Sequence, residues 1–144
     1  MPPQKQDKKK GGQSAPRTDP FIGSRLVLGL TSHNINDFLP EKDIALVMFY
    51  DPNDPQCEWS KKHFLKAAKT TVRENHAYAA IDCTQQDELC ETEGVTSLPS
   101  FKLYSKGKVF GVYDRPREFV YFTMRKFVEN APLLTEPQRP KRPC

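Results

Sequence analysis

The chain has 144 residues, with 22 Lys and Arg against 18 Asp and Glu, 13 Pro, 15 aromatic residues and four Cys. This length suits a single globular domain. The longest apolar run, residues 44–50, is far too short to span a membrane, and we expect no secretory signal because residues 1–10 are polar. Four cysteines in this length are too few for a disulfide scaffold.

The net charge of +4 belongs to the ends of the chain. Residues 1–20 carry a net +3 and residues 131–144 a net +2, which leaves 14 basic against 15 acidic residues between them. The same two ends hold eight of the 13 prolines and no aromatic residue. We therefore expect a disordered basic tail over 1–20, a folded domain over 21–130, and a Pro-rich linker or tail over 131–144 that ends in Cys144.

The folded part begins with a predicted strand over residues 25–30. Thr31 and Ser32 then offer N-cap oxygens to a short helix over 32–39, which we expect Pro40 to stop. Residues 44–50 (IALVMFY) are apolar without alternation. That pattern predicts a central strand that is covered on both faces.

Asp54 and Pro55 have the pattern of an N-cap followed by a first-turn proline. The helix that follows is predicted to run to about Asn75. Its apolar residues recur at helical spacing: Trp59, Phe64, Leu65, Ala68 and Val72. A second buried strand is predicted over 77–82, and a short helix over 87–93 that Gly94 closes.

The last third of the domain is predicted to be a hairpin and a helix. Residues 100–104 and 109–113 flank the turn sequence SKGK at 105–108. Pro116 is predicted to open the helix, whose periodic face would consist of Phe119, Phe122 or Thr123, Lys126 and Phe127. The order βαβαβαββα predicts an α/β fold with a central mixed sheet flanked by helices.

Four motifs in this order resemble one family. Residues 46–52 (LVMFYDP) are similar to the strand and loop that enter the active site of protein disulfide isomerases, which read roughly L-V-x-F-Y-A-P-W-C-G-H-C-K. Residues 81–84 (IDCT) with Leu89-Cys90, residues 94–101 (GVTSLPSF) and residues 113–117 (YDRPR) are similar to later motifs of that family. The resemblance covers about residues 24–130 and implies a thioredoxin-like fold.

The chain departs from the family pattern at the active-site loop. Alignment places Asp54 on the first catalytic cysteine and Cys57 on the second. Dithiol exchange needs the first thiolate to attack and the second thiol to resolve the mixed disulfide, and a carboxylate does neither. We therefore expect a redox-inactive loop in which Asp54 caps the helix, a contribution of about 0.5–2 kcal/mol. Met48 stands where many members carry a buried acid.

The alternative is a monothiol activity of Cys57. A helix N-terminus lowers a thiol pKa, whereas the nearby Asp54 raises it. We favour the interpretation of Cys57 as a small buried core residue. Arg117 matches the family's arginine near the active site, and without a nucleophile to tune we interpret it as a solvated charge at the start of a helix.

The resemblance also assigns a role to Cys83 and Cys90. Several family members join these positions by a structural disulfide, which would imply an oxidising compartment. The alternative is two buried free thiols. A metal site is not expected, because the cysteines lack C-x-x-C pairing and His33, His63 and His76 show no ligand spacing. No cofactor is expected.

Pro99 occupies the family's cis-proline position. In active relatives an extended substrate peptide pairs with the backbone beside it. Leu98 and Trp59, with Pro52 and Pro55, could give this edge an apolar surround. The alternative is that the cis-proline serves only the fold.

The resemblance implies a redox-inactive module of a multidomain protein disulfide isomerase in the lumen of the endoplasmic reticulum. Such a module would bind unfolded clients, partner proteins or other domains of its own chain, or space catalytic domains. The alternative function is a weak or monothiol isomerase activity through Cys57. The Lys8-Lys9-Lys10 run lacks interleaved aromatics, so we expect no nucleic-acid partner, and we also expect a monomer that does not bind membranes. The chain is expected to be a fragment of a longer protein.

Overall fold

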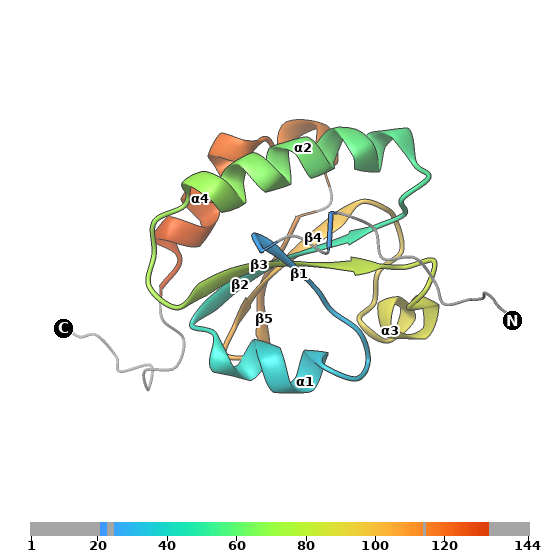
Figure 1. Ribbon diagram of the computed structural model, residues 1–144, viewed down its shortest axis with the longest axis horizontal. Coiled ribbons are helices and arrows are strands. Elements are labelled where there is room, and N and C mark those ends of the chain that lie inside the picture. Colours follow the sequence, from blue (N-terminus) through green and yellow to red (C-terminus); the bar gives the residue numbers. More distant parts are fainter. Residues whose placement is uncertain (1–20, 23–24, 114, 133–144) are drawn as a thin grey trace, which may run out of the picture.

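The computed structural model describes residues 21–22, 25–113 and 115–132. One mixed sheet forms the centre, with helices α2 and α4 on one face and α1 and α3 on the other (Figure 1). This arrangement confirms the predicted order of elements and the central sheet flanked by helices. The predicted tail over 1–20, and all but two residues of the predicted tail over 131–144, lie outside the described residues.

The elements follow one another with short connections. The strands are β1 (Val27–Gly29), β2 (Ile44–Tyr50), β3 (His76–Asp82), β4 (Ser100–Ser105) and β5 (Lys108–Tyr113). The α-helices are α1 (Ile35–Phe38), α2 (Pro55–Thr70), α3 (Asp87–Thr92) and α4 (Tyr121–Asn130). Two 3₁₀ turns, η1 (Leu39–Glu41) and η2 (Pro116–Glu118), precede β2 and α4.

The strand order in the sheet is β1-β3-β2-β4-β5. Strands β1 and β2 both run parallel to β3, whereas β4 is antiparallel to β2 and β5 is antiparallel to β4. The β4–β5 turn places Lys106 and Gly107 at positive φ, as a tight hairpin requires. The predicted parallel pairing of the early strands and the antiparallel end are confirmed.

Strand β2 is buried along its whole length, as its unalternating sequence predicted. Its even-numbered residues from Ile44 to Tyr50 pack in the core under α2 and α4. Its odd-numbered residues, Ala45, Val47 and Phe49, pack in the second core under α1 and α3. A central strand with helices on both faces therefore divides the apolar interior into two layers.

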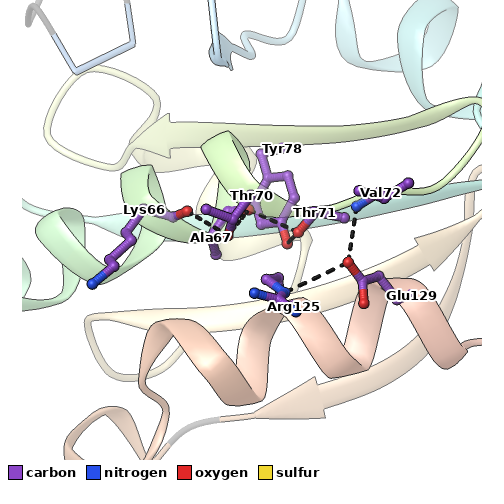
Figure 2. Close-up of polar contacts among 8 residues, drawn as sticks. All are labelled: Lys66, Ala67, Thr70, Thr71, Val72, Tyr78, Arg125 and Glu129. Atoms are coloured by element: carbon purple, nitrogen blue, oxygen red, sulfur yellow. Dashed lines mark hydrogen bonds and ion pairs between the residues drawn. The ribbon is translucent and has the colours of Figure 1, made fainter.

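Helix α2 ends at Thr70, five residues before the predicted end. The Thr71 hydroxyl donates to the Ala67 carbonyl (2.7 Å) and lies 2.5 Å from the Tyr78 hydroxyl of β3 (Figure 2). The next amide, of Val72, donates to the Glu129 carboxylate of α4 (2.8 Å), which also pairs with Arg125 (3.5 Å). Thr71 itself satisfies the Ala67 carbonyl, whereas Tyr78 and Glu129 come from β3 and α4, which the local sequence did not reveal.

The predicted core face of α2 is confirmed for the buried Phe64 and for the partly buried Leu65 and Ala68, but it is wrong for Trp59 and Val72. The buried residues are Cys57, Ser60, Lys61, Phe64 and Ala67. Trp59 is 39% exposed and Val72 is 83% exposed. The prediction counted the apolar stripe from Trp59, whereas the helix turns Cys57 and Phe64 to the sheet, because a helix residue and one seven positions later share a face.

Two further boundaries differ from the prediction. Pro116 opens the 3₁₀ turn η2, and α4 begins only at Tyr121, because the fully buried Phe119 packs between Phe101 and Tyr113 and holds the chain extended at Val120. The α4 residues that are buried are Met124 and Val128, whereas Phe122 of the predicted face is exposed.

The first helix is shorter than predicted. Helix α1 begins at Ile35, and the Thr31 hydroxyl accepts a hydrogen bond from the His33 amide (3.1 Å) instead of capping the helix. Pro40 was predicted to stop the helix, but it lies inside the 3₁₀ turn η1, near the start of that turn, where a missing N–H is tolerated. Among the residues described, no helix is both long and apolar enough to cross a membrane.

Candidate functional site

The loop between β2 and α2 is built around the helix cap that the sequence predicted. Asp54 has extended backbone angles, and its Oδ1 accepts a hydrogen bond from the Gln56 amide (2.8 Å). Pro55 occupies the first turn, where its missing N–H leaves no donor unpaired. In the loop segment before Asp54, the Asp51 carboxylate accepts a hydrogen bond from the Asn53 amide (2.8 Å). Asp54, which aligns with the family's attacking cysteine, therefore accepts a hydrogen bond from a backbone N–H in the first turn of α2.

Cys57 lies one turn further along and is fully buried in the core that also contains Met48. The pKa of its thiol is raised to about 11, mainly by burial and to a smaller extent by the carboxylates of Asp54 and Asp51. A hydrogen bond from the Asp51 amide (3.4 Å) and the charge of Lys61 act in the opposite direction. A thiol with that pKa is about one part in ten thousand thiolate at pH 7. The predicted burial of this cysteine is confirmed.

The Leu98–Pro99 peptide bond is cis, as the alignment implied. Pro99 is buried, and the half-buried Leu98 packs against both core layers. The Ser100 hydroxyl donates to the Ser97 carbonyl (2.7 Å) and closes the turn that leads into β4. The cis bond therefore lies directly before strand β4, next to the loop between β2 and α2.

A hollow of about 320 Å³ lies against the start of α2. It is lined by Pro55, Gln56, Trp59 and Arg117. The structure thus brings together the predicted binding residue Trp59 and the arginine of η2, for which the sequence indicated only a solvated charge. Leu98 and Pro99 are not among the residues that line this hollow.

His63, of which the sequence indicated only that it lacks metal-ligand spacing, has defined neighbours in the structure. Its ring lies between Trp59 (centroids 4.4 Å apart) and Tyr121 (6.3 Å apart), and its Nδ1 accepts a hydrogen bond from the Tyr121 amide (3.2 Å). Burial, with a smaller effect of Lys66, lowers the pKa of His63. The four-residue spacing of Trp59 and His63 was the available signal, since such pairs meet on a helix.

Cys83 and Cys90 are joined by a disulfide with a Cα–Cα distance of 5.8 Å. The bond links the loop after β3 to α3, on the face of the sheet opposite α2. Cys144 lies outside the described residues. Within the described ranges, no group of three or more His, Cys, Asp or Glu side chains is placed to hold a metal ion.

Comparison with known proteins gives a consistent family. The Thioredoxin family model matches residues 26–124. Protein disulfide-isomerase A5 of Bos taurus is 37% identical over 107 residues, which is 71% of this chain and 20% of that protein. Protein disulfide-isomerase of Saccharomyces cerevisiae is 30% identical over 93 residues, or 63% of this chain and 18% of that protein. The chain spans about a fifth of the length of these relatives.

Solved structures agree on the fold. The zinc-bound form of human ERp44 superposes with a TM-score of 0.64 at 22% identity, over 72% of this chain and 29% of that chain. Oxidised mitochondrial thioredoxin 3 of Saccharomyces cerevisiae gives a TM-score of 0.63 at 16% identity, over 78% of this chain and all of that chain. The chain belongs to the thioredoxin family and has protein disulfide isomerases among its homologues.

Proposed function

We propose that the chain is a thioredoxin-like module without dithiol chemistry at its active-site loop, which binds extended segments of unfolded client or partner proteins. The observation that carries the proposal is the conversion of the loop: Asp54 caps α2 where the family has its attacking thiol, while the cis bond before Pro99 is retained. Such a module would hold clients, or space catalytic domains, within a protein of the disulfide isomerase type.

The chemistry of the loop supports the absence of thiol exchange. Only Cys57 remains there, and a single thiol cannot close the loop's own disulfide. Its burial and raised pKa remove both requirements for a monothiol attack, which are access to the substrate and a thiolate at neutral pH. These observations weigh against the alternative of an activity through Cys57.

The surface beside the loop supports peptide binding. Trp59 offers an exposed indole and Arg117 an exposed guanidinium to the same hollow, a combination enriched at protein interfaces. Backbone groups next to a cis-proline at a strand entrance can pair with an extended peptide. An apolar contact, a charge and a backbone edge together suit polypeptide better than a small polar metabolite.

The proposed compartment is the lumen of the endoplasmic reticulum. This follows the resemblance to protein disulfide isomerases, and the Cys83–Cys90 bond suits an oxidising compartment.

Binding is tested with a fluorescently labelled protein that has been reduced and carboxymethylated, so that it stays unfolded and has no thiol. We expect saturable binding that Trp59→Ala and Arg117→Ala each weaken about tenfold. Val72→Ala, at an exposed apolar residue beyond the other end of α2, is the matched control and should bind like the parent chain. Equal affinity of all four chains would contradict the proposed site.

The absence of thiol chemistry is tested by insulin reduction with dithiothreitol as the reductant, in a Cys144→Ser background. We expect a rate equal to the uncatalysed rate. A rate above it that Cys57→Ala abolishes would overturn the redox-inactive assignment in favour of the monothiol alternative.

A further inference from the structure

An apolar hollow of about 430 Å³ lies between β5 and the second half of α4, on the face of the sheet that α2 and α4 cover. It is lined by Leu103, Phe110, Gly111, Lys126, Phe127, Asn130, Ala131 and Pro132. None of these residues lines the hollow beside Trp59. The second hollow is therefore a separate surface, which the proposed function does not use.

Gly111 leaves the hollow open from the side of the sheet. A Cβ built on this glycine would meet no heavy atom within 4 Å, and its backbone is not in the left-handed region. The facing residue of β4 is Leu103, which is buried, so the space above Gly111 has an apolar floor. Its volume accommodates an additional aliphatic side chain.

The strand that borders the hollow lies at the edge of the sheet. Among the described residues, β5 pairs only with β4. Half of the backbone N–H and C=O groups of an edge strand point away from the sheet and can pair with an added strand. The six residues of β5 (KVFGVY) contain one charge and no proline, and Val109, Phe110 and Val112 are exposed. Natural edge strands usually carry more protection than this.

The charged side chains that the described residues place at the hollow and at the start of β5 are lysines. Lys126 of α4 lines the hollow and Lys108 begins β5, and both are exposed. The residues that line the hollow include no carboxylate. An extended segment with an apolar side chain and flanking acidic residues would therefore complement both the hollow and its rim.

We propose that this surface binds an extended segment of another protein as a sixth strand along β5. One aliphatic side chain of that segment fills the space above Gly111, and a neighbouring Asp or Glu pairs with Lys126. The surface is a second polypeptide site on the same module, independent of the loop around Asp54 and Pro99.

The probe is a fluorescein-labelled peptide of nine residues. Its fifth residue is leucine, its third and seventh residues are glutamate, and valine and threonine alternate at the remaining positions. We expect saturable binding by fluorescence anisotropy, with shifts of the β5 backbone amides in NMR spectra. The same peptide with alternate backbone nitrogens methylated cannot form the ladder and should not bind. Equal binding of the methylated peptide, or no binding of the parent peptide at millimolar protein, would overturn the proposal.

Two variants locate the site. Gly111→Leu fills the hollow from the protein side and should weaken binding about tenfold or more without lowering the melting temperature. Lys126→Glu should weaken binding to the acidic peptide and favour a peptide with lysines in place of the glutamates, a reversal that a merely misfolded variant cannot produce. Lys69→Glu, at an exposed lysine of α2, is the matched charge control.

Two measurements distinguish binding along β5 from binding at the loop and from self-association. Trp59→Ala should bind the strand peptide like the parent chain, so a loss there would assign the peptide to the loop site instead. A dimer in sedimentation experiments that Gly111→Leu dissociates would show that a second copy of this chain occupies the edge, and would overturn the proposal of a separate partner.

Discussion

The two faces of the sheet are stabilised in different ways. Under α2 and α4 the core consists of aromatic and aliphatic side chains, in which Phe64 contacts the rings of Phe21, Tyr78 and Phe101. These two helices have 16 and 10 residues, long enough to cover the sheet. This face also carries both proposed binding surfaces.

On the other face, α1 and α3 have only four and six residues. Helices this short bury little surface, and α3 is held by additional links. The Cys83–Cys90 bond links α3 to the loop after β3, the Tyr104 hydroxyl donates to the Glu93 carboxylate (2.6 Å), and the Lys102 ammonium donates to the Glu93 carbonyl. Both faces have an apolar core, and the comparison indicates that a covalent bond and polar links supplement packing where the helices are short.

The largest expected effect is on the packed face. Phe64→Ala removes a fully buried ring and should lower the free energy of unfolding by about 3–5 kcal/mol, because the surrounding rings cannot close the cavity. Urea denaturation followed by circular dichroism measures the loss. Phe122→Ala, at an exposed phenylalanine of α4, is the control and should change stability by less than about 1 kcal/mol. Similar losses in the two variants would contradict the assigned core.

The next effect is on the face that the disulfide braces. Replacing both Cys83 and Cys90 by alanine should lower the free energy of unfolding by roughly 2.5 kcal/mol, since the bond closes a loop across a sequence separation of seven. Adding dithiothreitol to the parent chain should produce a similar loss and none in the double variant. A thiol count in denaturant should give two free thiols before reduction and four after it. Four before reduction would exclude the bond.

A smaller effect is expected at the cap that starts α2. Asp54→Ala should lower the free energy of unfolding by about 0.5–2 kcal/mol, whereas Asp54→Asn should retain most of it, because asparagine caps about as well as aspartate. Both variants should lower the pKa of Cys57 below its value of about 11, since the carboxylate raises it. The pH dependence of iodoacetamide labelling measures that pKa. An unchanged pKa in Asp54→Asn would exclude the electrostatic contribution.

The smallest effect concerns pH. Because the fold lowers the pKa of His63 below its ordinary value of 6.5, the unfolded chain binds more protons than the native chain just below pH 6.5. The free energy of unfolding is therefore highest, as far as His63 is concerned, above pH 6.5, and it decreases as the pH falls from 6.5 towards the lowered pKa. Chemical denaturation between pH 7.5 and 5.5 should show this slope, and His63→Gln should reduce it. A slope that persists unchanged in that variant would assign it to other groups.

Much of the fold could be predicted from local sequence. The unbroken apolar run of β2 and the Asp54-Pro55 start of α2 were both located correctly, because burial on two faces and helix capping act on neighbouring residues. The ends of helices were harder to predict from local sequence. At the end of α2 the Thr71 hydroxyl contacts Tyr78 of β3, and before α4 the buried Phe119 packs against Phe101 of β4. Both contacts involve residues that lie elsewhere in the sequence.

The candidate sites divide in the same way. The sequence by itself determined that Cys57 is the one cysteine between residues 50 and 60 and that residue 54 is an aspartate, which is the basis for proposing that the loop performs no dithiol exchange. Tertiary structure decided that Cys57 is buried with a raised pKa, that Arg117 shares a hollow with Trp59, and that Gly111 opens a second hollow at an edge strand. Covalent identity can be read along the chain, whereas burial, electrostatic environment and open edges depend on which distant elements the fold places side by side.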